Sequence, residues 1–444
     1  MMSPRIRPAL LLLWLCAAAA LFGPVIVGAF EGRQAAPVAV LLLALCVYAF
    51  SRFNRSALPR RLVVVALSAC LAVTAFDLGA RAYQYYVLDD RPKEFFLHPW
   101  PPLPQLLRYE PGVRFEGELY GDLSGMSGRR EWRDYKRTLF ITDRHGFRNE
   151  PAEGGGADAP DLIVLGDSFG AARRTRQDET LSALLARASG RRVYNLSVGA
   201  ASPWQEYANL LAEADRLRPK EGAVVLWLLF SGNDLDEQYF PYFEKSQFPW
   251  RGEFKQWVDS LRRFRERSPV HAIVTRRGPP ASEQVIEKSF VDGRRLLFLR
   301  QYARNKDRTA EEVRRHPNFE KLGATVGAMR RLADARGLRV VVALVPSKEE
   351  VYSWALEGAP PWTAGVEPSP FSAALEEMSR QNGMPYLDLK PELVNASKRA
   401  FEDSGELLWL SDDSHWNLLG QRVAAGAIQR ELLSPLGLGA ARPK

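Results

Sequence analysis

The feature that most constrains the fold is an alternation of short apolar runs with amphipathic segments from residue 161 onward. The apolar runs have the length of strands and too little alternation to leave one face in water. Strands that alternate with helices predict a three-layer α/β/α domain, in which helices cover both faces of a parallel sheet. The predicted strands lie in 161–166, 191–198, 222–230, 338–346 and 384–389, and the predicted helices in 178–190, 203–219, 318–337 and from about 416.

Three apolar stretches lie ahead of this domain. Residues 9–30 and 35–51 contain no charge, and residues 62–80 contain only Asp77. The first is long enough to span a bilayer as a helix, which takes about 20 residues, and the other two approach that length. A cleaved signal peptide is the alternative for the first stretch, but no small-x-small cleavage site follows it. We therefore expect three transmembrane helices.

The arginines around these stretches predict the topology. They precede the first stretch and fill the loop between the second and third, so the positive-inside rule places both in the cytoplasm. Everything after about residue 80 is then periplasmic or extracellular, and the protein is a multi-pass protein of the cytoplasmic membrane. Residues 1–80 hold seven arginines and two acids, which accounts for +5 of the net charge of +8. The basic balance thus reflects topology, and we expect no nucleic-acid partner.

We expect three regions. Residues 1–82 form the membrane anchor, residues 83–158 an accessory region ending in a glycine-rich linker, and residues 159–436 the main domain, with a charged insertion at about 235–317. The three cysteines lie within the apolar stretches, so the outer domain has no thiolate for a disulfide or a metal site. No cluster has metal-ligand spacing and no glycine-rich phosphate loop is present, so we expect neither a metal nor a cofactor.

Small or polar residues follow the predicted strands, at the sheet edge where sites of such folds lie. "GDS" at 166–168 follows the first strand, Asn195 with "SVGAAS" follows the second, and "SGND" at 231–234 follows the third. "DDSH" at 412–415 precedes the last helix. We expect these segments to meet at one edge.

This set resembles the SGNH, or GDSL-like, hydrolase family. "GDS" matches its first block, "GND" its third, and "DDSH" its D-x-x-H, over roughly 161–433 apart from the insertion. "GDSFG" also fits the G-x-S-x-G elbow of α/β-hydrolases, but there the elbow follows several strands and the acid lies well before the histidine. Here the serine follows the first strand of the domain, and acid and histidine share one segment.

The resemblance implies roles for individual residues. Ser168 is the expected nucleophile, His415 the base, and Asp412 the acid that orients the imidazole, with Asp413 as its rival. The expected oxyanion donors are the Ser168 backbone, the Asn233 side chain and one backbone N–H of the second block. The family's glycine in that block falls at Ala200, with Gly199 just before it, and an alanine serves if its φ is negative.

Three functions follow. The first is a serine esterase that removes acyl groups, expected to be O-acetyl, from cell-surface or exported polysaccharide. The second is a polysaccharide O-acetyltransferase with the same triad, which "PSKEEVY" at 346–352 favours because it resembles a stretch of alginate O-acetyltransferases. Transfer requires a membrane partner that brings acetyl groups outward. The third is a non-catalytic glycan-binding or assembly protein on a retained fold.

Overall fold

The computed structural model describes residues 76, 79, 95, 97–100, 103–150, 159–237, 284–289, 294–360, 363 and 365–438. The three predicted transmembrane segments therefore lie outside the described residues, apart from positions 76 and 79. Within the described part of the chain, no helix combines the length and apolar character needed to cross a membrane. The elements below all belong to one compact unit, Arg91–Pro241 with Pro279–Lys444.

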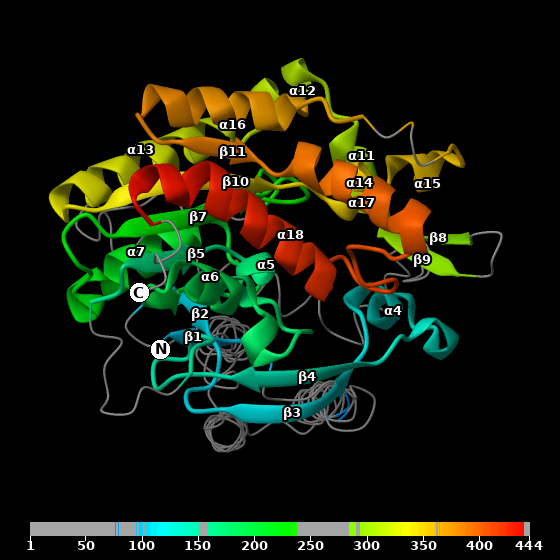
Figure 1. The fold of residues 1–444 in the computed structure, drawn as a ribbon, viewed down its shortest axis with the longest axis horizontal. Helices are drawn as coiled ribbons and strands as arrows, with labels where there is room; N and C mark the ends of the chain where they lie inside the picture. Colours follow the sequence, from blue (N-terminus) through cyan, green and yellow to red (C-terminus); the bar gives the residue numbers. More distant parts are fainter. Residues whose placement is uncertain are drawn as a thin grey trace, which may run out of the picture. The chain divides into compact units, whose positions relative to one another are not determined.

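The centre of this unit is a five-stranded sheet in the order β11-β10-β7-β5-β6, and every neighbouring pair is parallel (Figure 1). The predicted parallel sheet is therefore confirmed. The first two strands of the domain in sequence are β5 and β6, and the order reverses between β5 and β7, which creates a crevice at their carboxyl ends. The strands are β5 (Leu162–Leu165), β6 (Val193–Asn195), β7 (Val224–Phe230), β10 (Arg339–Val345) and β11 (Tyr386–Asp388).

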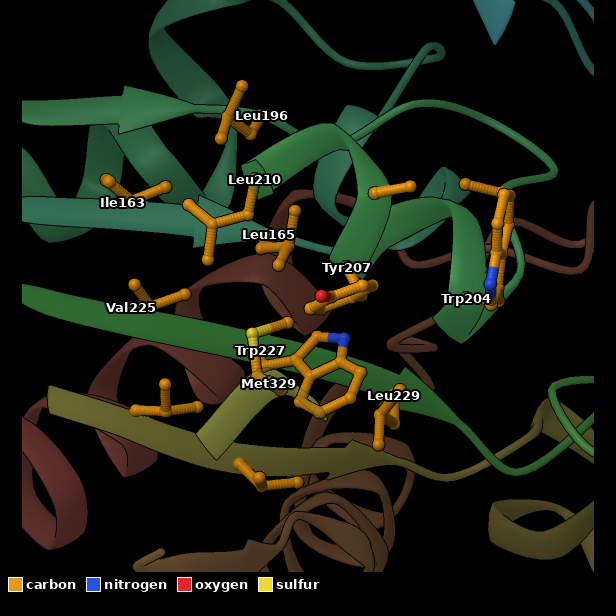
Figure 2. Packing of buried hydrophobic residues seen from close by; sticks show 14 of the residues in the cluster. Ile163, Leu165, Leu196, Trp204, Tyr207, Leu210, Val225, Trp227, Leu229 and Met329 are labelled. Atoms are coloured by element: carbon orange, nitrogen blue, oxygen red, sulfur yellow. The ribbon is translucent and has the colours of Figure 1, made fainter. Parts of the chain in front are cut away.

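Successive side chains of the strands pack into two separate cores because they point to opposite faces of the sheet. On one face Val225, Trp227 and Leu229 pack with Tyr207 and Met329, as Figure 2 shows. The helices on this face are α7 (Pro203–Leu217), α13 (Phe319–Ala335) and α16 (Pro370–Gln381).

The other face is covered by a second set of helices. Val224, Leu226 and Leu228 point into this core, together with Leu185. The covering helices are α6 (Leu181–Ser189), α17 (Lys390–Ser404) and α18 (Leu418–Ile428). Both faces of β7 are buried, which explains why its sequence is continuously apolar.

The accessory region consists of antiparallel pairs that pack on the first core. Tyr109, Phe140 and Phe147 belong to the same apolar cluster as the sheet residues. Tyr194 of β6 donates to Asp143 over 2.6 Å, so the segment 142–150 joins the two parts directly. The elements are β1 (His98–Trp100), β2 (Leu103–Arg108), β3 (Arg114–Leu119), α4 (Asp122–Ser127) and β4 (Lys136–Ile141).

The predicted insertion contains regular structure where it is described. An antiparallel pair, β8 (Val285–Ser289) and β9 (Arg295–Leu299), is followed by α11 (Arg300–Lys306) and α12 (Ala310–Arg315). The Leu297 N–H donates to the Ser411 carbonyl over 2.8 Å, so β9 lies against the segment just before "DDSH". The short elements are α5 (Ser168–Ala171), α14 (Lys348–Val351) and α15 (Ser353–Glu357), the 3-10 turns Arg130–Trp132, Gln177–Glu179 and Ser434–Leu436, and the π-helical turn Gln429–Leu433.

Candidate active site

Ser168 stands at a tight turn between β5 and the one-turn helix α5. Asp167 caps this helix, because its Oδ1 accepts the Phe169 N–H over 2.9 Å. The two glycines of "GDSFG" allow close packing: a Cβ on Gly166 would lie 2.9 Å from Leu228 Cβ, and a Cβ on Gly170 would lie 2.1 Å from Ser197 Oγ. Ser168 is the first residue of α5, so its own N–H has no acceptor within that helix.

His415 lies 247 positions after Ser168 in the chain but contacts it in the folded domain. Its Nε2 lies 2.7 Å from the Ser168 Oγ, which is hydrogen-bond distance for a base and the hydroxyl it deprotonates. Ser168 Oγ also lies 3.3 Å from Asp167 Oδ2, a longer contact. The ring of His415 packs against Phe169, with centroids 5.0 Å apart. The structure thus brings the predicted nucleophile and base together.

Asp413, and not Asp412, orients the imidazole. Asp413 Oδ1 lies 2.5 Å from His415 Nδ1, and it also accepts the His415 backbone N–H over 2.8 Å. With the proton on Nδ1 facing Asp413, Nε2 is left with a lone pair toward Ser168. The preference for Asp412 is therefore wrong in this structure, and its rival takes the place.

Asp412 instead ties residues 410–415, which we call the acid loop, to the accessory region. Its Oδ2 accepts the Gly121 N–H and the Ser124 hydroxyl, each over 2.7 Å, and the Asp134 N–H over 3.0 Å. These three donors draw its side chain toward the accessory region. Asp412 and Asp413 are neighbours in the chain, but their carboxylates point to different partners, and this is why Asp412 does not orient the imidazole.

Arg174 is the main charge partner of the Asp413–His415 pair. Its Nε lies 2.7 Å from Asp413 Oδ2, and its side chain is only 16% exposed. Burial alone would raise the pKa of Asp413, but Arg174 and the His415 ring outweigh burial and hold it well below its usual range. Burial works to lower the pKa of His415, whereas Asp413 and then Asp122 raise it, and the net direction is upward.

Sequence reasoning missed this role of Arg174. In the sequence Arg174 stands in a run with Arg173 and Arg176, a pattern that by itself indicates a solvated basic loop or an arm that steers anionic substrates. Arg174 does neither, because it is mostly buried against a carboxylate. No local signal in the sequence distinguishes it from its neighbours; only the fold brings Asp413 beside it.

Lys348 and Tyr352 lie beneath the acid loop and do not line a cleft. Both side chains are fully buried. Lys348 Nζ donates to the carbonyls of Leu410, Ser411 and Asp413 at 2.8, 3.1 and 2.9 Å. The Tyr352 hydroxyl accepts the Leu408 N–H over 2.8 Å. The "PSKEEVY" segment therefore fixes the backbone path that carries Asp413 and His415.

Of the two candidate backbone donors after β6, one is already used. The Gly199 N–H donates to the Tyr109 hydroxyl over 3.0 Å. Ala200 then remains as the candidate, but its φ is +59°, in the left-handed region. The condition that its φ be negative is therefore not met. An alanine in this conformation carries strain that a glycine would not.

Asn233 leaves the sheet from β7, next to the strand that carries Ser168. Its Nδ2 donates to Glu237 over 2.7 Å, which fixes the amide orientation and leaves one N–H of the group for another acceptor. The roles of Asn233 and Ala200 as oxyanion donors stay predictions.

One hollow is lined by Ser168, and a second hollow adjoins the first. The smaller, of about 10 Å³, has room for roughly one water-sized group. Its lining consists of Ser168, Phe169, His415, Trp416 and Gln421 together with residues 172–175. The larger, of about 550 Å³, runs between β4, residues 405–411 and the start of α18. The two share Arg174 and Thr175 as a common wall.

Three side chains of the types that bind metal ions lie close together in the candidate active site. Atoms of Asp122, Asp413 and His415 lie within 4.8 Å of one another in the described part of the chain. These atoms are engaged in the hydrogen bonds of the acid loop and the serine, so we assign the cluster to proton transfer and not to a metal.

A serine, a histidine and an aspartate in a hydrogen-bonded line at the carboxyl edge of a parallel sheet define a serine-hydrolase type of site. Residues 297–443 match the family model of the SGNH hydrolase-like domain of the acetyltransferase AlgX. The match includes Asp413 and His415 and begins after Ser168. It confirms the resemblance to SGNH hydrolases, and the chain is an enzyme of ester chemistry, either a hydrolase or an acetyltransferase.

Comparisons with whole proteins add little. None of the curated proteins searched matches the chain. Similar solved structures include the psychrotrophic esterase EstA from Pseudoalteromonas sp., with 10% identity, 62% of this chain and 98% of that chain covered, and a TM-score of 0.31. A putative lipolytic protein of the G-D-S-L family from Desulfitobacterium hafniense gives 13%, 62%, 100% and 0.31 for the same measures. Likenesses with TM-scores this low carry no weight for fold or function.

Proposed function

We propose that the protein is a serine esterase that acts on O-acetyl groups of a polysaccharide outside the cytoplasmic membrane, to which its N-terminal apolar stretches anchor it. The observation that carries the proposal is the contact of 2.7 Å between Ser168 Oγ and His415 Nε2, with Asp413 on the far side of the ring.

The geometry supports a two-step acyl mechanism. As Ser168 Oγ attacks the ester carbonyl, its proton moves to His415 Nε2, and the imidazolium formed is stabilised by Asp413. The tetrahedral intermediate collapses when Nε2–H protonates the leaving sugar oxygen, which leaves acyl-Ser168. A water molecule, deprotonated by the same nitrogen, then attacks the acyl carbon. The bond from this carbon to Ser168 Oγ breaks as Nε2–H returns the proton to Oγ, and acetate leaves.

The sizes of the two hollows support a small acyl group on a large substrate. The hollow lined by Ser168 has the volume of about one water, which matches the methyl of an acetyl group better than a longer acyl chain. The adjoining groove of about 550 Å³ is wide enough for part of a polymer. Apart from Arg174, which is paired with Asp413, the cations of its lining are Lys136, Arg137, Arg294 and Arg422, and the acids are Asp134, Glu179 and Glu406.

Acetyl transfer is the second candidate function. The match to an acetyltransferase domain supports it. The mechanism differs only in the group that attacks acyl-Ser168, a sugar hydroxyl in place of water. Transfer further needs a membrane partner that delivers acetyl groups to the outer side.

One experiment tests the function and separates the two candidates. The purified protein and its Ser168→Ala variant are incubated with 4-nitrophenyl acetate, with and without acetyl-free oligosaccharides. Mass spectrometry then measures free acetate and acetylated sugar. We expect release or transfer that depends on Ser168; equal rates in both proteins would refute the enzyme function and favour a glycan-binding role.

A further inference from the structure

Asp122 of the accessory region is joined to the acid loop in both directions. Its Oδ1 accepts the Ser414 N–H over 2.8 Å, and its Oδ2 accepts the Ser414 hydroxyl. In return, the Asp122 N–H donates to Asp413 Oδ2 over 2.9 Å. We call these three hydrogen bonds the clasp. They join Asp122 to residues about 290 positions later in the chain, so they form only because the accessory region packs against the main domain.

The clasp brings a second carboxylate to the catalytic histidine. Asp122 Oδ2 lies 3.6 Å from His415 Nδ1, on the same side of the ring as Asp413. Asp122 is only partly exposed, at 28%, so water screens its charge incompletely. It cannot replace Asp413 as the hydrogen-bond acceptor at this distance, but its charge favours the protonated ring.

The position of Asp122 is tightly fixed. It is the first residue of α4, and the preceding Gly121 lies against the acid loop so closely that a Cβ there would meet the Asp412 carbonyl oxygen at 2.0 Å. From the main domain, Lys348 Nζ donates to the carbonyls of Leu410 and Asp413. The acid loop is therefore held between the main domain and the accessory region.

We propose that Asp122 is a positioning residue for His415: it fixes Ser414 and Asp413 so that the imidazole faces Ser168, and its carboxylate adds negative charge beside the ring. The accessory region then completes the active site and is more than a spacer. The inference rests on the proposed function, since it assigns Asp122 to the triad of that enzyme.

If Asp122 has only a structural role, its loss should have a different effect from the loss of a positioning residue. Loss of a structural contact lowers the amount of folded protein and leaves the titration of His415 unchanged. Loss of a charge beside the ring lowers the pKa of His415. The charged groups around this ring are Asp413, Asp122, Arg174 and, near Ser168, Asp167. Only Asp122 among them comes from the accessory region.

The test compares Asp122→Asn with Asp122→Glu, which restores the charge, and with Glu118→Gln. Glu118 is an exposed acid of β3 in the same region, so its variant controls for net charge. The full-length proteins are treated with a fluorophosphonate probe from pH 5 to about pH 9, and the rate of Ser168 labelling is measured. Carbon-13 NMR of labelled histidine gives the titration of His415 directly, assigned with His415→Gln.

We expect Asp122→Asn to lower the labelling rate about 10-fold, because a misplacement of 1 Å can cost about 10²-fold, and to shift the His415 titration to lower pH. Asp122→Glu should return the titration toward the wild type, and Glu118→Gln should match the wild type. An unchanged His415 titration in Asp122→Asn would overturn the proposal. Because NMR needs no turnover, absence of labelling in the wild type would refute the proposed function alone.

Discussion

The exchange of Asp413 for asparagine tests the triad most sharply. The Asp413 carboxylate accepts from His415 Nδ1 on one oxygen and from Arg174 on the other. An asparagine there must turn its NH₂ group toward one of these donors. If it faces the ring, Nδ1 has to become the acceptor, and the proton moves to Nε2, which can then no longer deprotonate Ser168.

The loss of such an acid in a serine triad costs about 10⁴-fold in kcat, which corresponds to about 5.5 kcal/mol of transition-state stabilisation. We expect Asp413→Asn to lower kcat on 4-nitrophenyl acetate by about 10³- to 10⁴-fold with a small change in KM. The matched control is Asp412→Asn, where the amide oxygen can still accept from Gly121 and Ser124, so kcat should stay within about 10-fold. A larger loss in Asp412→Asn than in Asp413→Asn would refute our assignment of the acid.

Three further predictions concern pH and stability. Because the pKa of His415 lies above its ordinary value of about 6.5, kcat/KM should rise with pH through a midpoint above 6.5; a midpoint at or below 6.5 would contradict the electrostatic account. The same shift stabilises the fold fully below pH 6.5, and this contribution is lost as pH rises through the folded-state pKa. Ala200→Gly relieves a φ of +59° and should raise the free energy of unfolding by about 1 kcal/mol; chemical denaturation that shows a loss of stability would argue against the strain. Lys348→Met leaves three carbonyls of the acid loop without their donor and should lower the free energy of unfolding by about 3 kcal/mol or more, whereas a denaturation midpoint equal to that of the wild type would show that water replaces the ammonium group.

The sheet could be predicted from the sequence because its strands are buried on both faces. A run such as the one in β7 has no polar position at all, and few other structures tolerate that. Ser168 and His415 could be predicted because they stand at a strand exit and before a helix. Both positions can be recognised from the local sequence, and both lie at the same edge of the sheet.

The acid of the triad could not be predicted because both candidates lie within three residues of His415. Which carboxylate faces the ring depends on the backbone path of the acid loop. That path is set by Lys348 from one side and by residues 121 and 122 from the other, all distant in the chain. The buried state of Arg174 depends on the same long-range packing, and so does the left-handed φ of Ala200.

The central claim is that Ser168, activated by His415, carries an acyl group during turnover. The most direct measurement is peptide mass spectrometry after brief treatment with 4-nitrophenyl acetate and acid quenching. We predict an acetyl group on the peptide that contains Ser168, absent in Ser168→Ala and strongly reduced in His415→Ala. An acetyl group on another residue, retained at the same level in Ser168→Ala together with full activity, would contradict the account.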